Sequence, residues 1–215
     1  MKSIIVERKS ENEFGYYLYA PNKEPDCKLP LIVFLHGSGE RGNGTTDLPL
    51  VNKNALPRYI CEGSEYPAFV LCPQCPTGFV WNNLVIPLKQ LIDKIAEEYP
   101  VDSERISITG ISMGGYGTWE MGITYPNFFS CISPVCGGGF SWRTGLLKNE
   151  KIWAFHGDAD NVVPLRNSLE MVDGVNKNGG NAKLTIFHGV EHNSWDSAYL
   201  ETKIIDWLLG NKRES

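Results

Sequence analysis

The stretch Gly110-Ile111-Ser112-Met113-Gly114 decides how the rest of the chain is interpreted. It follows the apolar run 106–109, which predicts a buried strand, and it leads into residues 113–125, which predict a helix. A serine between two such glycines is typical of a sharp strand-to-helix turn that holds the hydroxyl in strained backbone geometry. Because the pattern is short, its weight comes from the strand and the helix that flank it. We therefore treat Ser112 as a candidate nucleophile.

Further strands and helices are predicted on both sides of this turn. Apolar runs that predict strands occur at 4–8, 14–20, 31–35, 68–72, 131–135, 151–155 and 182–187, and helical spacing of apolar residues occurs at 84–99, 165–178 and 194–209. The first two runs lie close together and predict an antiparallel pair. Strands that alternate with helices predict an α/β fold, with a mostly parallel central sheet and helices on both faces. No linker or repeat interrupts the order, so residues 1–215 are predicted to form a single domain.

The composition excludes several classes of protein. Of 215 residues, 42% are hydrophobic and 21% are charged, which is typical of a folded globular chain. The formal net charge is -5 and no basic cluster is present, so no nucleic-acid partner is expected. No stretch approaches the ~20 apolar residues of a membrane helix, so no membrane partner is expected either. The oligomeric state leaves no signal in the sequence.

The first eight residues bear on the compartment. They contain too few apolar side chains for the core of a secretory leader. We expect a cytoplasmic protein from the sequence as given, or a periplasmic or secreted one if a leader has been removed.

The histidines were compared as partners for Ser112, because a serine nucleophile needs a base and the base needs an orienting acid. His36 and His156 each stand in a His-Gly pair at the end of a predicted strand, where an imidazole more often holds loops together than reacts. His188 ends an apolar strand directly. His192 lies in a loop before the last predicted helix, from which it can reach back over the sheet edge. We favour His192 over His188 as the base.

Two aspartates compete for the role of the acid. Asp158 and Asp160 both follow the predicted strand 151–155. The ordinary interpretation of either residue is a turn former or a helix cap. Asp160 lies in the turn directly before the next predicted helix. We favour Asp160 and leave Asp158 as a structural residue.

An oxyanion hole completes the predicted constellation. It needs two backbone N–H groups that converge on the oxygen of the attacked carbonyl. Met113, directly after the serine, is predicted to supply one. The glycine-rich loop after residues 31–35 should supply the other, with Ser38 as the first choice and Gly39 as the next.

At this point the residues resemble a particular group of α/β-hydrolases. The chain is similar to the dienelactone hydrolase-like and polyhydroxybutyrate depolymerase-like esterases, which include feruloyl and acetyl esterases and predicted peptidases. The stretches that carry the resemblance are Leu35–Gly42, Gly110–Trp119, His156–Pro164 and Gly189–Trp195. The resemblance implies the α/β-hydrolase fold and, at matching positions, Asp160 and His192 beside Ser112. Dienelactone hydrolases proper use cysteine as the nucleophile, so that particular activity is not expected.

The resemblance implies a serine carboxylesterase that hydrolyses short-chain or aromatic esters, of the feruloyl or acetyl type, on small molecules or carbohydrates. About fifteen residues follow 131–135 before the next strand, too few for a helical cap domain, so an open cleft is expected. Gly39, Trp81 and Trp142 are candidate substrate contacts, although Trp81 is as readily interpreted as a buried core residue. A peptidase or a thioesterase would use the same triad. A binding module without catalysis is a further alternative, disfavoured because every catalytic component is present.

No metal and no organic cofactor is expected, because backbone donors alone can polarise the carbonyl. Cys72-Pro73-Gln74-Cys75 has the spacing of a redox pair or of half a zinc site. No second pair of this spacing occurs, so we favour a structural role for both cysteines.

Overall fold

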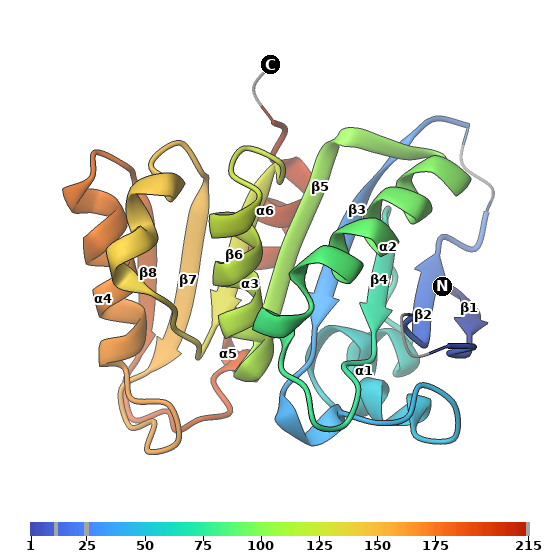
Figure 1. Ribbon diagram of the computed structural model, residues 1–215, viewed down its shortest axis with the longest axis horizontal. Coiled ribbons are helices and arrows are strands. Elements are labelled where there is room, and N and C mark those ends of the chain that lie inside the picture. The colour runs from blue at the N-terminus through green and yellow to red at the C-terminus, as the bar shows by residue number, and fades with distance from the viewer. Residues whose placement is uncertain (11–12, 24–25, 214–215) are drawn as a thin grey trace.

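The computed structural model describes residues 1–10, 13–23 and 26–213, and eight strands form one sheet in the order β1-β2-β4-β3-β5-β6-β7-β8 (Figure 1). β2 pairs antiparallel with β1 and with β4, and the remaining neighbours are parallel. The predicted antiparallel pair and the mostly parallel sheet are confirmed. The strands are β1 (Lys2–Val6), β2 (Tyr16–Ala20), β3 (Leu29–Leu35), β4 (Phe69–Pro73), β5 (Val101–Ile111), β6 (Cys131–Val135), β7 (Ile152–Gly157) and β8 (Ala182–Phe187).

The central strands are apolar on both sides because each faces two cores. In β3, Leu31, Val33 and Leu35 belong to one buried cluster, while Ile32 and Phe34 belong to the cluster on the opposite face. This is why residues 31–35 show no alternation of polar and apolar side chains.

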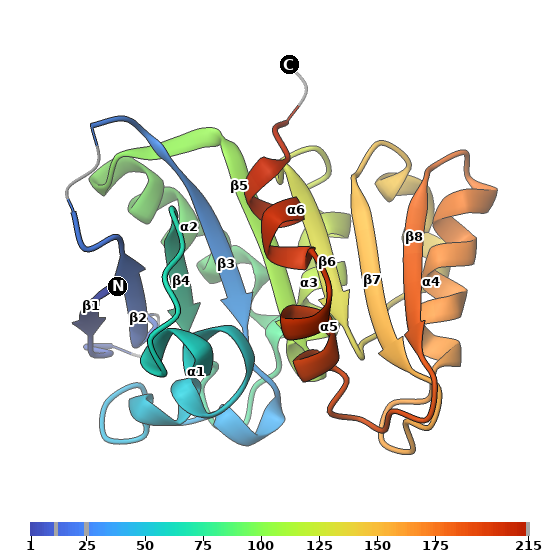
Figure 2. The same ribbon diagram turned by 180° about the vertical axis from the view of Figure 1, so that it is seen from behind.

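Helices cover both faces of the sheet, as predicted. Figure 1 shows α2 (Val85–Glu98), α3 (Met113–Thr124) and α4 (Arg166–Lys177) in front, and Figure 2 shows α1 (Ala55–Cys61), α5 (Trp195–Glu201) and α6 (Ile204–Gly210) on the other side. Short 3-10 helices lie at Ser38–Glu40 (η1), Leu48–Lys53 (η2), Trp81–Asn83 (η3) and Ser141–Leu147 (η4). The connection between β6 and β7 contains only η4, so no helical cap lies over the ends of the strands.

The single helix predicted for residues 194–209 is wrong, because the chain forms two helices there. Thr202 has an extended backbone, with φ -116° and ψ 176°, which ends α5. Its hydroxyl donates to the carbonyl oxygen of Ala198 at 2.6 Å and accepts from the N–H of Ile204 at 3.2 Å. The threonine side chain thus takes the place of backbone partners at the break. The apolar spacing on the two sides is continuous, so periodicity alone does not reveal the interruption.

The two cysteines of the C-x-x-C stretch face opposite sides of the sheet. Cys72 packs in the cluster beneath α1 and α6, and Cys75 packs in the cluster beneath α2 and α3. Both are buried and free. In the described part of the chain, no helix is long and apolar enough to cross a membrane.

Candidate active site

Ser112 stands at the tip of the turn between β5 and α3. Its backbone has φ 53° and ψ -116°, a conformation that side-chain-bearing residues rarely adopt, and its N–H donates to the carbonyl oxygen of Val135 at 3.0 Å. A Cβ atom on Gly110 would lie 2.5 Å from the carbonyl oxygen of Gly114. The first glycine of the motif is therefore required by the close approach of strand and helix, and the strained turn that the sequence predicts is present.

The side chain of Ser112 ends a line of hydrogen bonds through His192 to Asp160. His192 Nε2 lies 2.9 Å from Ser112 Oγ, and His192 Nδ1 lies 2.7 Å from Asp160 Oδ2. An ionised carboxylate only accepts, so Nδ1 carries the hydrogen and Nε2 is free to accept the serine proton. Asp160 follows β7 and His192 lies in the loop after β8. The structure brings together the three residues that the sequence singled out.

The Asp160 carboxylate is enclosed and saturated with donors. Its Oδ1 accepts from the N–H groups of Val162 and Val163, each at 2.9 Å. Burial on its own would raise the pKa of Asp160, but the bonds from His192, Val163 and Val162 outweigh it, and the pKa lies below its ordinary value. The acid is therefore ionised at neutral pH and fixes the tautomer of His192.

Asp158 and His188 form a separate pair at the surface. His188 Nδ1 lies 2.7 Å from Asp158 Oδ2, and Asp158 Oδ1 accepts from the N–H of Gly189 at 2.7 Å. The His188 side chain is 88% exposed, whereas that of His192 is 20% exposed. Of the two candidate acids and the two candidate bases, only Asp160 and His192 lie in line with the serine.

The predicted oxyanion-hole residues lie beside Ser112 on two elements. Met113 begins α3, where the first N–H groups of a helix have no partner within the helix. A Cβ atom on Gly37 would lie 3.7 Å from Ser112 Cβ, so the loop that continues into Ser38 and Gly39 runs directly alongside the serine. Both of these residues are exposed, and a Cβ on Gly39 would meet no atom within 4 Å. A role for the N–H groups of Met113 and Ser38 as the oxyanion hole stays a prediction.

Side chains around this loop hold it in place, and of these the sequence predicts only the role of His36. Arg41 Nε donates to the carbonyl oxygen of Ser38 at 2.9 Å. His36 Nδ1 donates to the carbonyl oxygen of Gly37 at 2.6 Å, and its Nε2 accepts from the N–H of Cys75 at 2.9 Å. Burial lowers the pKa of His36 to about 4, so the ring is neutral and keeps both bonds at neutral pH. His36 thus ties loops together, as expected for a strand-end His-Gly pair.

Trp81 is not a substrate contact, and that prediction is wrong. Its side chain has 0% exposure, and its Nε1 donates to the carbonyl oxygen of His36 at 3.0 Å. The ring packs 6.0 Å from that of Phe14 and lies against Gly117. The alternative interpretation, a core tryptophan, is the one that the structure supports. Burial of the indole with its N–H satisfied explains why a large aromatic residue is placed here.

Trp142 lies at the surface, at the start of η4. It is 81% exposed, and its ring centre lies 6.3 Å from that of Phe140, which is 52% exposed. The two rings form a small exposed aromatic surface on the connection that follows β6. β6 is the neighbour of β5, the strand that leads to Ser112. A role for Trp142 in substrate binding stays a prediction.

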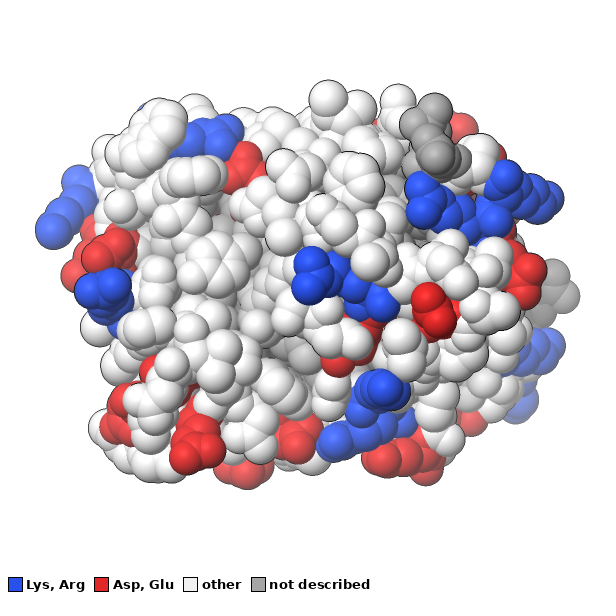
Figure 3. Space-filling view, turned by 60° about the horizontal axis from the view of Figure 1, so that its bottom comes forward, with Lys and Arg blue, Asp and Glu red and all other residues white. Residues whose placement is uncertain are grey.

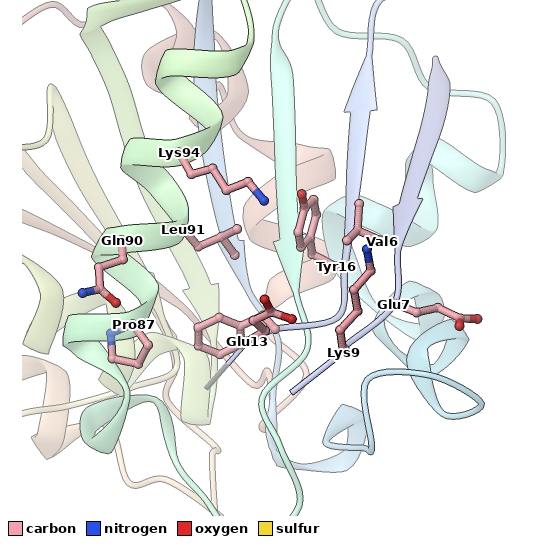
Figure 4. A pocket seen from close by; sticks show the side chains of 10 residues that line it. Val6, Glu7, Lys9, Glu13, Tyr16, Pro87, Gln90, Leu91 and Lys94 are labelled. Atoms are coloured by element: carbon pink, nitrogen blue, oxygen red, sulfur yellow. The ribbon is translucent and has the colours of Figure 1, made fainter. Parts of the chain in front are cut away.

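Other surface features lie apart from the triad. A groove of about 270 Å³ between β2 and α2 is lined by apolar side chains such as Tyr16 and Leu91 and by charged ones such as Glu13 and Lys94 (Figure 4). None of the triad residues lines it. Figure 3 brings the carboxyl ends of the strands forward and shows both acidic and basic side chains on this side of the molecule. Within the described residues, no group of three or more His, Cys, Asp or Glu side chains could hold a metal ion.

Comparison with known proteins assigns the chain to a family. A family profile described as Phospholipase/Carboxylesterase matches residues 81–203, more than half of the chain. The chain belongs to the Phospholipase/Carboxylesterase family. The matched range includes Ser112, Asp160 and His192. The predicted α/β-hydrolase fold is confirmed, and the predicted relationship to carboxylesterases is confirmed as membership of this family.

Individual relatives of this carboxylesterase-family chain are esterases and a depolymerase. A solved structure described as a thermostable esterase is 34% identical, with a TM-score of 0.82, over 98% of this chain and 63% of that one. Poly(3-hydroxyalkanoate) depolymerase C of Paucimonas lemoignei is 23% identical over 80% of this chain. A bifunctional acetylxylan esterase/xylanase of Neocallimastix patriciarum is 28% identical over 81% of this chain. The chain spans 42% and 25% of the length of these two curated relatives.

Proposed function

We propose that the chain hydrolyses carboxylic esters through an acyl-enzyme intermediate formed on Ser112. The observation that carries this is the line of hydrogen bonds from Ser112 Oγ through His192 to Asp160 Oδ2. Ser112 Oγ attacks the ester carbonyl carbon while His192 Nε2 takes its proton. The alkoxide then leaves with that proton, and the acyl group stays on the serine. Asp160 stabilises the imidazolium that exists between these two transfers.

Deacylation repeats the same steps with water as the nucleophile. His192 removes a proton from water, the hydroxide adds to the acyl carbonyl, and Ser112 departs with the proton that His192 returns. In both halves the carbonyl oxygen becomes negative. The N–H groups of Met113 and Ser38 are placed to stabilise it, each contributing on the order of 3 kcal/mol in the transition state. These steps need only the side chains and backbone groups of this chain.

The substrate class that we propose is an ester of a short acyl group on a small soluble molecule or a carbohydrate. Support comes from the short β6–β7 connection, which leaves the serine without a helical cap, and from the exposed rings of Phe140 and Trp142, which suit stacking against a sugar or an aromatic acid. Similarity to an acetylxylan esterase/xylanase points the same way.

A fluorophosphonate probe tests the nucleophile. We expect the wild-type protein to be labelled and Ser112→Ala to remain unlabelled, with loss of p-nitrophenyl acetate hydrolysis in the same variant. Ser38→Ala serves as a control, because its backbone N–H is retained and labelling should continue. Equal labelling of wild type and Ser112→Ala, or labelling of neither, would contradict the mechanism.

A substrate panel tests the class. We expect release of acetate from acetylated xylo-oligosaccharides and release of short acyl groups from simple esters, with little cleavage of the matching amides. Methyl ferulate tests an aromatic acyl group, and a thioester series tests the thioesterase alternative. Trp142→Ala should raise KM for the sugar ester and leave p-nitrophenyl acetate unchanged. Faster cleavage of amides or thioesters than of esters would replace the proposed substrate class.

A further inference from the structure

His156 is buried at the end of β7 and takes no part in the steps described above. It is 0% exposed and lies four residues before Asp160. Its Nε2 is 2.8 Å from the carbonyl oxygen of Val163 and 3.2 Å from Asp160 Oδ2. A carbonyl oxygen can only accept, so Nε2 carries a hydrogen. That one N–H faces both the carbonyl and the carboxylate oxygen that binds His192.

The other ring nitrogen is held from α4. His156 Nδ1 lies 2.7 Å from Ser168 Oγ, and Ser168 is also fully buried. Burial lowers the pKa of His156, although the Val163 carbonyl and Asp160 work in the opposite direction, so the ring is neutral. Ser168 Oγ also lies 3.0 Å from the carbonyl oxygen of Gly137, and its single hydrogen can point to only one of these acceptors. With the hydrogen of the neutral ring on Nε2, that hydroxyl hydrogen goes to Nδ1 at the shorter distance of 2.7 Å. Both nitrogens are therefore satisfied, and the plane of the ring is fixed.

His156 contacts Asp160 in two ways, directly and through the backbone of Val163. The N–H of Val163 donates to Asp160 Oδ1, while the carbonyl oxygen of the same residue accepts from His156. His192 and His156 approach Oδ2 from two sides, at 2.7 Å and 3.2 Å. Without the imidazole, Oδ2 would keep His192 as its hydrogen-bond donor, and the Val163 carbonyl would lose its partner inside the protein. The turn that holds Oδ1 through the N–H of Val163 would then lose a support, and the carboxylate would be held less firmly in line with His192 and Ser112.

We propose that His156 is a positioning residue for Asp160, which it holds in the orientation that keeps His192 aligned with Ser112. This role rests on the proposed function, because it affects the rate only if Ser112, His192 and Asp160 are the catalytic residues. His156 itself does not reach the substrate. A small displacement of a positioning contact lowers the rate because the reacting groups must meet within narrow limits of distance and angle.

Two substitutions that differ by one methylene separate positioning from general packing. In His156→Gln the side-chain nitrogen can take the place of Nε2 and reach Asp160. In His156→Asn the amide oxygen can take the place of Nδ1 and accept from Ser168, but the shorter side chain does not bring a donor to Asp160. We expect the Asn variant to lose roughly tenfold to a hundredfold in kcat on p-nitrophenyl acetate with KM nearly unchanged, and the Gln variant to recover most of that loss. Equal kcat values for two folded variants would overturn the proposal.

Two spectroscopic measurements make the test independent of activity and of variant folding. The low-field proton NMR signal of the His192 Nδ1–H bonded to Asp160 should persist in His156→Gln and weaken or vanish in His156→Asn. In the wild-type protein, nitrogen-15 NMR should show His156 as the neutral tautomer, with Nε2 protonated and Nδ1 unprotonated. The opposite tautomer would overturn the proposal even if neither variant folds. If the wild type hydrolyses no ester while both signals appear as expected, the proposed function fails and the positioning role stands.

Discussion

A Cβ atom on Gly114 would lie 1.9 Å from the carbonyl oxygen of Leu35, so the first turn of α3 touches the last residue of β3. Gly115 lies close to Val135 on the other side, where an added Cβ would lie 2.5 Å from the carbonyl oxygen. The helix that follows Ser112 is therefore pressed between the ends of β3 and β6. The same contact sets the distance between the N-terminus of α3 and the loop that leads to Ser38.

We expect Gly114→Ala to destabilise the protein by about 3 kcal/mol or more, because the atom in the way is backbone and cannot rotate aside. Chemical denaturation at neutral pH measures this. Gly210→Ala is the matched control, since a Cβ there would meet no atom within 4 Å, and its stability should stay within about 0.5 kcal/mol of wild type. Similar midpoints for Gly114→Ala and wild type would mean that α3 can move away from β3 at little cost.

The two neighbouring aspartates should differ sharply in their effect on rate. Asp160→Asn removes the charge that stabilises the imidazolium and allows the wrong tautomer of His192, so we expect kcat to fall roughly a thousandfold or more. Asp158→Asn changes a surface contact with His188 and should alter kcat by less than about fivefold. Steady-state kinetics on one ester compares them. A greater loss for Asp158 would assign the acid to that residue.

The thiols give a test of the fold that needs no substrate. Cys27 and Cys61 are exposed, while Cys72, Cys75, Cys131 and Cys136 are buried. Burial raises the pKa of Cys75, Cys131 and Cys136 to about 12, so these thiols are protonated and poor nucleophiles at neutral pH.

Titration with a coloured disulfide reagent should therefore modify Cys27 and Cys61 rapidly in the native protein and all six cysteines after unfolding without a reductant. A total of four thiols in the unfolded protein would show a disulfide that the structure lacks. Rapid reaction of all six in the native protein would show that the buried thiols are accessible.

Much of this fold is predictable because its strands are buried on both faces. In β6 the apolar run and the strand coincide at residues 131–135, since every side chain there is buried. In β5 the strand begins five residues before the predicted run, because Asp102 to Arg105 are polar and lie on a partly exposed extension of the strand. The pairing with β3 shifts register between Leu29 and Leu31 and resumes at Val101, which hydrophobic periodicity does not reveal.

The triad is predictable for a different reason, and its surroundings are not. Parallel strands bring their carboxyl ends to one edge, so residues directly after strands converge whatever their separation in sequence. The contact between His156 and Asp160 depends on how a turn of four residues folds back on the strand, and no pattern in the sequence specifies that. Trp81 shows the same limit, because an aromatic residue in a loop gives no sign of whether it faces solvent or core.

Glu150 connects stability to pH at the opposite end of the sheet from the triad. It is 5% exposed, and its carboxylate accepts from the N–H of Asn127. Burial raises the pKa of Glu150 from 4.5 to about 7, although the Asn127 bond lowers it. The folded protein thus holds this proton more tightly than the unfolded chain does. Its contribution to stability is complete below about pH 4.5 and is lost as the pH rises towards 7.

Glu150→Gln should remove that loss, because the amide oxygen still accepts from Asn127 and carries no charge. We expect the variant to match wild type at pH 4.5 and to be more stable by about 1–3 kcal/mol at pH 8. Denaturant unfolding at both pH values measures the difference. Glu97→Gln, at an exposed position of α2, is the control and should shift stability equally at both. Because Glu150 is far from the serine, ester hydrolysis should be unchanged. A Glu150→Gln gain that is the same at pH 4.5 and pH 8 would mean that the carboxyl is not the group that titrates.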